Sequence, residues 1–159
     1  MVVQRPTSAD RGANLEYFVG ASLALSISLL ATFVGFDRDR AFYPTVMIVI
    51  AAYYGLFAVM GGSTQALILE SVVMAGFLLL SILGFKFNLW LVVAGLCAHG
   101  VFDIFHGHFI SNLGVPVWWP MFCLTYDIAA AAYLAWLLNR STLTVKTAEA
   151  GRSILFFLA

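Results

Sequence analysis

Charged residues are scarce in this sequence. Asp, Glu, Lys and Arg make up 10% of its 159 residues, and eight basic residues balance eight acidic ones. A basic patch that would bind nucleic acid is therefore absent. Only two cysteines occur, Cys97 and Cys123, so no disulfide framework is expected. CxxC, CxxCH, Walker and GxSxG motifs are also missing, which removes the common signatures of thiol redox, c-type haem, nucleotide-binding and serine-hydrolase proteins.

Instead of charged residues, the sequence contains long apolar runs. Hydrophobic residues make up 62% of the chain, and the mean hydropathy is +0.96. Crossing the hydrocarbon of a bilayer takes roughly 20 mostly apolar residues. Five segments meet this condition, at about 15–36, 41–60, 64–85, 87–109 and 115–138. The predicted fold is therefore an all-α integral membrane protein, a compact bundle of five antiparallel transmembrane helices with short loops.

This prediction divides the chain into three parts. A polar N-terminal segment, residues 1–14, precedes the transmembrane domain, residues 15–138, and a C-terminal tail, residues 139–159, follows it. The side of the membrane that holds the N-terminus carries only Arg5 and Arg11. The opposite side carries Arg38, Arg40, Lys86, Arg140, Lys146 and Arg152. Because basic residues favour the cytoplasmic side, we expect an extracytoplasmic N-terminus and a cytoplasmic C-terminus.

The fourth predicted segment contains the most informative run, His99-Gly-Val-Phe-Asp103-Ile-Phe-His106-Gly-His108. At about 100° per residue, Asp103 lies about 40° from His99 around the helix, and His106 lies about 20° on the other side. Ionisable groups in a bilayer are costly, turn inward and mark functional sites. We therefore predict a site on this face, with four candidate metal ligands: His99, Asp103, His106 and His108.

Glu70 and Asp127 add two carboxylates in the third and fifth segments, in the same half of the membrane as the histidines. No Lys or Arg lies within a predicted span. These carboxylates must therefore be protonated, share protons with the histidines, or bind a metal ion. Imidazole and carboxylate together suit a divalent ion, with Zn and Fe as candidates, and a metal-free polar network is the alternative. In the metal interpretation, Glu70 or Asp127 completes the ligand sphere or acts as a catalytic acid or base.

The spacing of the histidine run loosely resembles the histidine motifs of membrane-bound di-iron oxygenases and intramembrane zinc hydrolases. Both families carry more histidines, spread over several helices, so their activities are not transferred to this chain. Three functions stay open. The first is a metal-dependent enzyme that acts on a lipid or another membrane-soluble substrate. The second is a proton- or metal-coupled transporter or transporter subunit, and the third is a structural membrane subunit. A bundle of five helices is thin, so a homo-oligomer is also expected.

Overall fold

The structure is a computed structural model that describes residues 8–140, with side chains from residue 15 onward. Within this range it contains five long helices and one short 3-10 helix. They are α1 (Ser8–Val34), η1 (Phe36–Arg38), α2 (Phe42–Met60), α3 (Thr64–Lys86), α4 (Trp90–Phe109) and α5 (Trp119–Asn139). All five predicted segments are helical, and α1 begins seven residues before the predicted span. Most of the predicted C-terminal tail lies outside the described residues.

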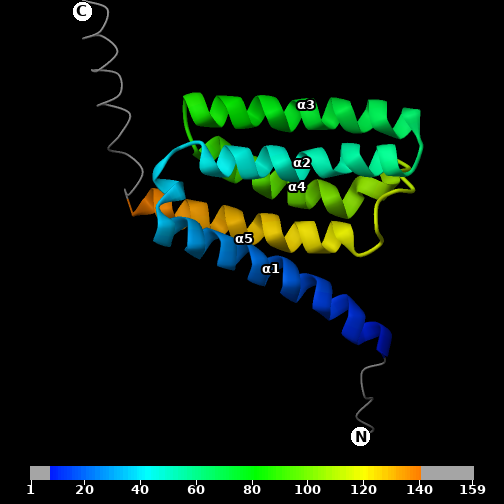
Figure 1. Cartoon of the computed structure of the whole chain (residues 1–159), viewed down its shortest axis with the longest axis horizontal. Coiled ribbons are helices and arrows are strands. Elements are labelled where there is room, and N and C mark those ends of the chain that lie inside the picture. Colours follow the sequence, from blue (N-terminus) through cyan, green and yellow to red (C-terminus); the bar gives the residue numbers. More distant parts are fainter. Residues whose placement is uncertain (1–7, 141–159) are drawn as a thin grey trace, which may run out of the picture.

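The helices lie side by side, with α1 and α3 at the two outer edges and α2, α4 and α5 between them (Figure 1). The connections 61–63 and 110–118 lie at one end of the molecule, and 35–41 and 87–89 lie at the other. Helices α2 to α5 each pack against their sequence neighbours. Helix α1 differs, because it packs chiefly against α5. The short loop between α1 and α2 would have favoured packing of α1 against α2.

Local sequence signals set the ends of several helices. Gly35 ends α1 in the left-handed region, at a φ of 94° that residues with a Cβ rarely adopt. The Ser63 side chain caps α3 by accepting a hydrogen bond from the Ala66 amide at 3.1 Å. Pro120 lies in the first turn of α5, where a missing amide hydrogen costs nothing. These signals keep the connections between helices short.

The outer surface of the bundle is strongly apolar. Large side chains such as Phe33, Val72 and Phe85 are exposed on the outer faces of α1 and α3. Each of the five long helices is long and apolar enough to cross a membrane. In a soluble protein, an apolar surface of this extent would be a liability. The described part of the chain is thus all-helical, with five candidate membrane spans.

Two glycines allow the helices around α5 to approach closely. A Cβ at Gly20 of α1 would lie 2.3 Å from the Phe122 carbonyl oxygen of α5. A Cβ at Gly100 of α4 would lie 3.2 Å from the Leu124 carbonyl oxygen and 3.3 Å from the Asp127 Cβ. Small residues at helix crossings are common in membrane bundles. Here the crossing at Gly100 brings the residue beside it, His99, against Asp127.

Candidate metal centre

Three buried side chains from two helices meet inside the bundle. His99 and Asp103 lie one turn apart on α4, and Asp127 faces them from α5. The His99 Nδ1 atom lies 2.8 Å from Asp127 Oδ2 and 3.5 Å from Asp103 Oδ2. These residues are at most 2% exposed, and one ligand atom from each lies within 4.8 Å of the others. Among the described residues, this trio, hereafter the triad, is the group of His, Cys, Asp and Glu side chains that can hold a metal ion.

The triad has two carboxylates and one imidazole, so it can carry more negative than positive charge. Within the described part of the chain, Asp103 Oδ2 and Asp127 Oδ1 are buried and have no hydrogen-bond partner. One imidazole can neutralise one carboxylate, and no Lys or Arg residue lies near the middle of α4 or α5. An uncompensated carboxylate in an apolar interior costs several kcal/mol. A proton or a metal ion must therefore supply the missing positive charge.

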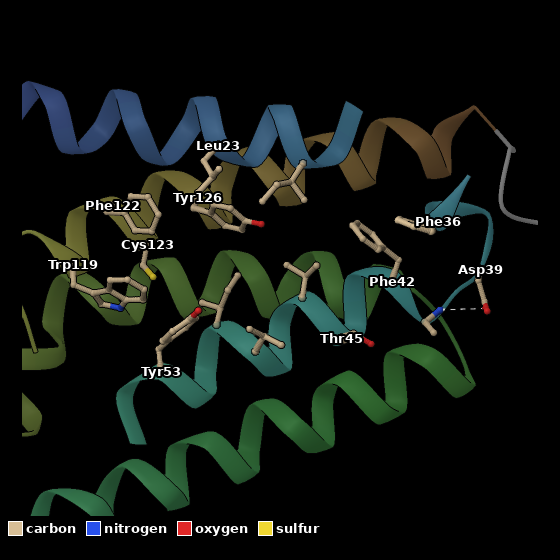
Figure 2. Close-up of a pocket in the computed structure, with 15 residues that line it drawn as sticks. Leu23, Phe36, Asp39, Phe42, Thr45, Tyr53, Trp119, Phe122, Cys123 and Tyr126 are labelled. Carbon is tan, nitrogen blue, oxygen red and sulfur yellow. Dashed lines mark hydrogen bonds between the residues drawn. The ribbon is translucent and has the colours of Figure 1, made fainter. Parts of the chain in front are cut away.

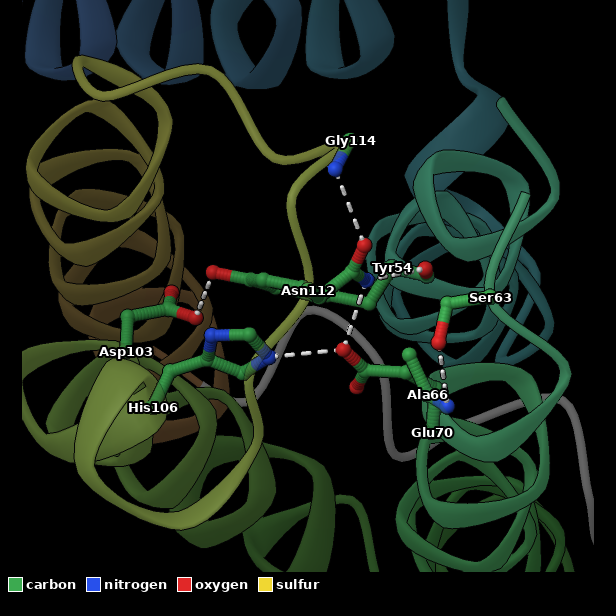
Figure 3. A network of polar contacts seen from close by, with 8 residues as sticks. All are labelled: Tyr54, Ser63, Ala66, Glu70, Asp103, His106, Asn112 and Gly114. Carbon is green, nitrogen blue, oxygen red and sulfur yellow. Dashed lines mark hydrogen bonds and ion pairs between the residues drawn. The ribbon is translucent and has the colours of Figure 1, made fainter. Parts of the chain in front are cut away.

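Glu70 and His106 form a second buried pair beside the triad. His106 Nε2 lies 2.8 Å from Glu70 Oε1, and both residues are at most 3% exposed. The Asn112 side-chain amide, from the connection between α4 and α5, donates to the same Glu70 oxygen at 2.8 Å and to the Tyr54 carbonyl oxygen at 3.1 Å. Figure 3 shows Asn112 lying between Tyr54 and Glu70. These bonds fasten the loop after α4 to α2 and α3.

Tyr54 of α2 links the pair to the triad. Its hydroxyl donates to Asp103 Oδ1 at 2.5 Å, and its ring lies 4.3 Å from the His106 ring, measured between centroids (Figure 3). Neither Tyr54 nor Asn112 was predicted as a site residue from the sequence. Tyr54 belongs to an apolar run rich in aromatic residues, where a role in packing is the more common one. Only the position of α2 against α4 shows that its hydroxyl reaches a carboxylate.

The predicted site residues lie in three different places in the structure. His99 and Asp103, two of the four predicted ligands, lie close together, and Asp127, predicted as a catalytic residue or an additional ligand, lies beside them. His106, also predicted as a ligand, lies with Glu70 in the second pair. His108 is exposed, because it lies about 160° around the helix from His106, on the outer side of α4.

The donor set of the triad differs from the expected one. The sequence suggested three histidines and one carboxylate of the same helix as candidate ligands. The structure brings together one histidine and two carboxylates. Carboxylate oxygens are harder ligands than imidazole, so this set shifts the preference toward oxygen-loving divalent ions while still accommodating Zn and Fe. Cys123, a buried thiol on α5, is not part of the described group and offers no soft ligand to it.

Comparison with protein-family models, with curated proteins and with solved structures finds no match to this chain. The function must therefore be argued from the site alone.

Proposed function

We propose that this chain is an integral membrane metalloprotein that binds one divalent ion through His99, Asp103 and Asp127. The observation that carries the proposal is a pair of buried carboxylate oxygens, Asp103 Oδ2 and Asp127 Oδ1, which have no hydrogen-bond partner among the described residues and lie beside a single imidazole. A divalent ion supplies the positive charge that these groups lack, and a ligand set of this kind leaves coordination positions open. The basic residues favour an orientation in which this half of the bundle faces the extracytoplasmic side.

The function that this site supports best is a metal-dependent enzyme for a lipid or another membrane-soluble substrate. A divalent ion at the triad supplies Lewis-acid chemistry toward a substrate oxygen. Tyr54 orients Asp103 through its hydrogen bond, as second-shell groups commonly orient metal ligands. The Glu70–His106 pair, whose imidazole ring lies 4.3 Å from the Tyr54 ring between centroids, is suited to accept or supply a proton during turnover. Apolar walls around the site exclude water from these groups.

The two buried histidines of α4 give a matched test of metal binding. We expect near-stoichiometric metal in the detergent-purified protein, measured by elemental mass spectrometry. His99→Ala removes a triad residue and should lose this metal. His106→Ala removes an equally buried imidazole outside the triad and should keep it. Metal-free wild-type protein, or equal metal loss in both variants, would contradict this assignment.

A second candidate function, ion transport, is favoured by polar groups at the opposite end of the bundle. Asp37 of η1 is 5% exposed and accepts a hydrogen bond from the Thr32 hydroxyl. The Thr32 hydroxyl also lies 3.0 Å from that of Tyr133. Asp37 thus places a buried carboxylate at the end of the bundle opposite the triad, as an ion path across the bundle would need. Proton or metal flux into liposomes that is lost in Asp37→Asn and in Asp103→Asn, without turnover of lipid, would favour transport over catalysis.

A further inference from the structure

Asn112 makes three hydrogen bonds at the end of the bundle that holds the connection between α4 and α5. Its Nδ2 atom donates to the Tyr54 carbonyl oxygen at 3.1 Å and to Glu70 Oε1 at 2.8 Å. Its Oδ1 atom accepts from the Gly114 amide at 3.2 Å (Figure 3). A backbone carbonyl can only accept and a backbone amide can only donate. Turning the Asn112 amide over would break both backbone bonds, so its NH2 group must face Glu70.

The backbone of this connection is also held against the end of α2. A Cβ on Gly114 would overlap the Phe57 carbonyl oxygen and would lie 2.9 Å from the Gly61 amide nitrogen. Only a residue without a side chain fits this contact. Asn112, two residues before Gly114, is therefore positioned by backbone packing as well as by its own hydrogen bonds.

The orientation of Asn112 decides which atom of the Glu70–His106 pair carries the hydrogen between them. Glu70 Oε1 accepts from Asn112 and also lies 2.8 Å from His106 Nε2. Both distances lie in the range of about 2.7–2.9 Å that is typical of hydrogen bonds to an ionised group. An ionised carboxylate oxygen is an acceptor only. The hydrogen therefore belongs to Nε2, and the imidazole donates to Glu70.

The second ring nitrogen of His106, Nδ1, is the one left for proton exchange. An imidazole has two nitrogens, and the hydrogen bond made by one of them determines the state of the other. Figure 3 shows Nε2 toward Glu70 and Nδ1 on the opposite side of the ring, toward Asp103. Because Nε2 keeps its hydrogen for Glu70, a proton that the pair takes up or releases must be carried by Nδ1.

An apolar groove between α1, α2 and α5 lies on a different face of α2. Figure 2 shows Tyr53 among the residues that line this groove. Tyr54 is the next residue, about 100° around the helix, and its ring lies against His106 instead. Glu70, His106 and Asn112 are not among the described lining residues of the groove. Tyr53 is therefore a control position one residue from the network and outside it.

We propose that Asn112 is a positioning residue that acts through Glu70, fixing His106 in the tautomer with hydrogen on Nε2 and leaving Nδ1 to exchange the proton. Glu70, a catalytic candidate from the sequence, then positions His106 and does not itself transfer the proton. A carboxylate that fixes the tautomer of a catalytic histidine is a recurring arrangement in enzymes. This inference rests on the proposed function, because proton exchange matters only if the site carries out a reaction. The tautomer itself can be measured without turnover.

The test is NMR of the full-length chain purified in detergent, isotopically labelled in its histidine nitrogens and glutamate carboxyl carbons. The signals of His106 and Glu70 are identified by their loss in His106→Ala and Glu70→Gln. In the wild-type protein we expect hydrogen on His106 Nε2 and an ionised carboxylate at Glu70. Hydrogen on Nδ1 with none on Nε2, or a protonated Glu70, would overturn the proposal.

A pair of variants isolates the contribution of Asn112. Glu70→Gln can offer His106 either an oxygen or an NH2 group, but only the oxygen also satisfies Asn112. With Asn112 present, we expect less than about a tenth of the molecules to carry the hydrogen on Nδ1 alone. In Glu70→Gln/Asn112→Ala this constraint is lost, and that fraction should rise at least about threefold.

The control for the double variant is Glu70→Gln/Tyr53→Phe, which should keep the tautomer of Glu70→Gln. Equal tautomer ratios with and without Asn112 would overturn its role as a positioning residue. A majority of the Nδ1 tautomer in Glu70→Gln would overturn it equally, whether or not the double variant folds.

Metal content of the same samples separates this proposal from the proposed function. Bound metal, together with hydrogen on Nδ1 and none on Nε2, would refute the positioning of His106 and leave the metal centre standing. Hydrogen on Nε2 in a wild-type protein that holds no metal would refute the proposed function and leave the positioned His106 standing.

Discussion

Replacing Asp127 by Asn distinguishes a metal-bound triad from a metal-free one, because only a bound metal makes the stability change on substitution depend on a chelator. Asparagine keeps the size of aspartate and removes its charge. Without metal, two carboxylates and one imidazole are buried together, and Asp127 Oδ1 has no hydrogen-bond partner among the described residues. Neutralising Asp127 then leaves one carboxylate with one imidazole and removes the cost of burying or protonating the second carboxylate, so we expect the protein to gain about 1–4 kcal/mol of stability.

With metal, the same substitution removes a charged ligand. An ion present at about a hundred times its Kd stabilises the folded protein by about 2.7 kcal/mol. Loss of a second-shell partner alone weakens metal binding about 10- to 100-fold, and loss of a ligand should reach at least the upper value. At the same metal concentration Asp127→Asn should then lose about 2 kcal/mol of that stabilisation. A chelator should therefore lower the stability of wild type by about 2 kcal/mol more than that of the variant.

The assay is thermal unfolding in detergent, with Zn²⁺ or Fe²⁺ in excess and again with chelator, together with metal content by elemental mass spectrometry. Asp37→Asn is the control, since Asp37 is a buried carboxylate at the other end of the bundle and lies outside the triad. It should leave metal content and the chelator effect unchanged. An Asp127→Asn protein that keeps full metal content, or that loses as much stability as wild type when the chelator is added, would refute the assignment of Asp127 as a ligand.

Three further predictions concern the residues around the triad. Tyr54→Phe removes the hydroxyl that donates to Asp103, so metal affinity measured by chelator competition should fall about tenfold with no loss of helix content. Unchanged affinity would show that Tyr54 does not orient the ligand. Glu70→Gln weakens a hydrogen-bond acceptor shared by His106 and Asn112, so the free energy of unfolding should fall by about 1–3 kcal/mol while metal content stays at the wild-type value. Loss of metal would instead place Glu70 among the ligands. His108→Ala alters an exposed side chain, so it should change stability by less than about 0.5 kcal/mol and leave metal content unchanged. Lower metal content would return His108 to the ligand set.

The helices were predictable because hydropathy is a local property of the chain. Twenty or so apolar residues in a row specify a long helix without reference to the rest of the fold, and the observed α2 and α3 end within one residue of the predicted segments. The helix starts were less accurate where a polar segment precedes the apolar run. Helix α1 extends back through Gly12 to Ser8, since polar residues can continue a helix and a single glycine weakens it without ending it.

The candidate site was only half predictable, because the sequence specifies contacts within one helix and not contacts between helices. His99 and Asp103 are one turn apart on a single helix, so their contact follows from helical spacing. His106 shares that face by the same spacing, yet it pairs with Glu70 because α3 lies beside the part of α4 that holds it. Spacing within one helix does not tell which neighbouring helix meets each turn.

The sequence by itself determined five apolar helices, the scarcity of internal positive charge, and the gathering of ionisable residues into a few turns of these helices. Tertiary structure alone decided that Asp127 completes the triad, that Tyr54 links it to the Glu70–His106 pair, and that a groove opens between α1 and α2. The physical reason is that nearly uniform apolar helices carry little information about rotation and partner choice. Those are set by close contacts at small residues such as Gly20 and Gly100 and by the pairing of a few buried polar groups, which depend on all helices at once.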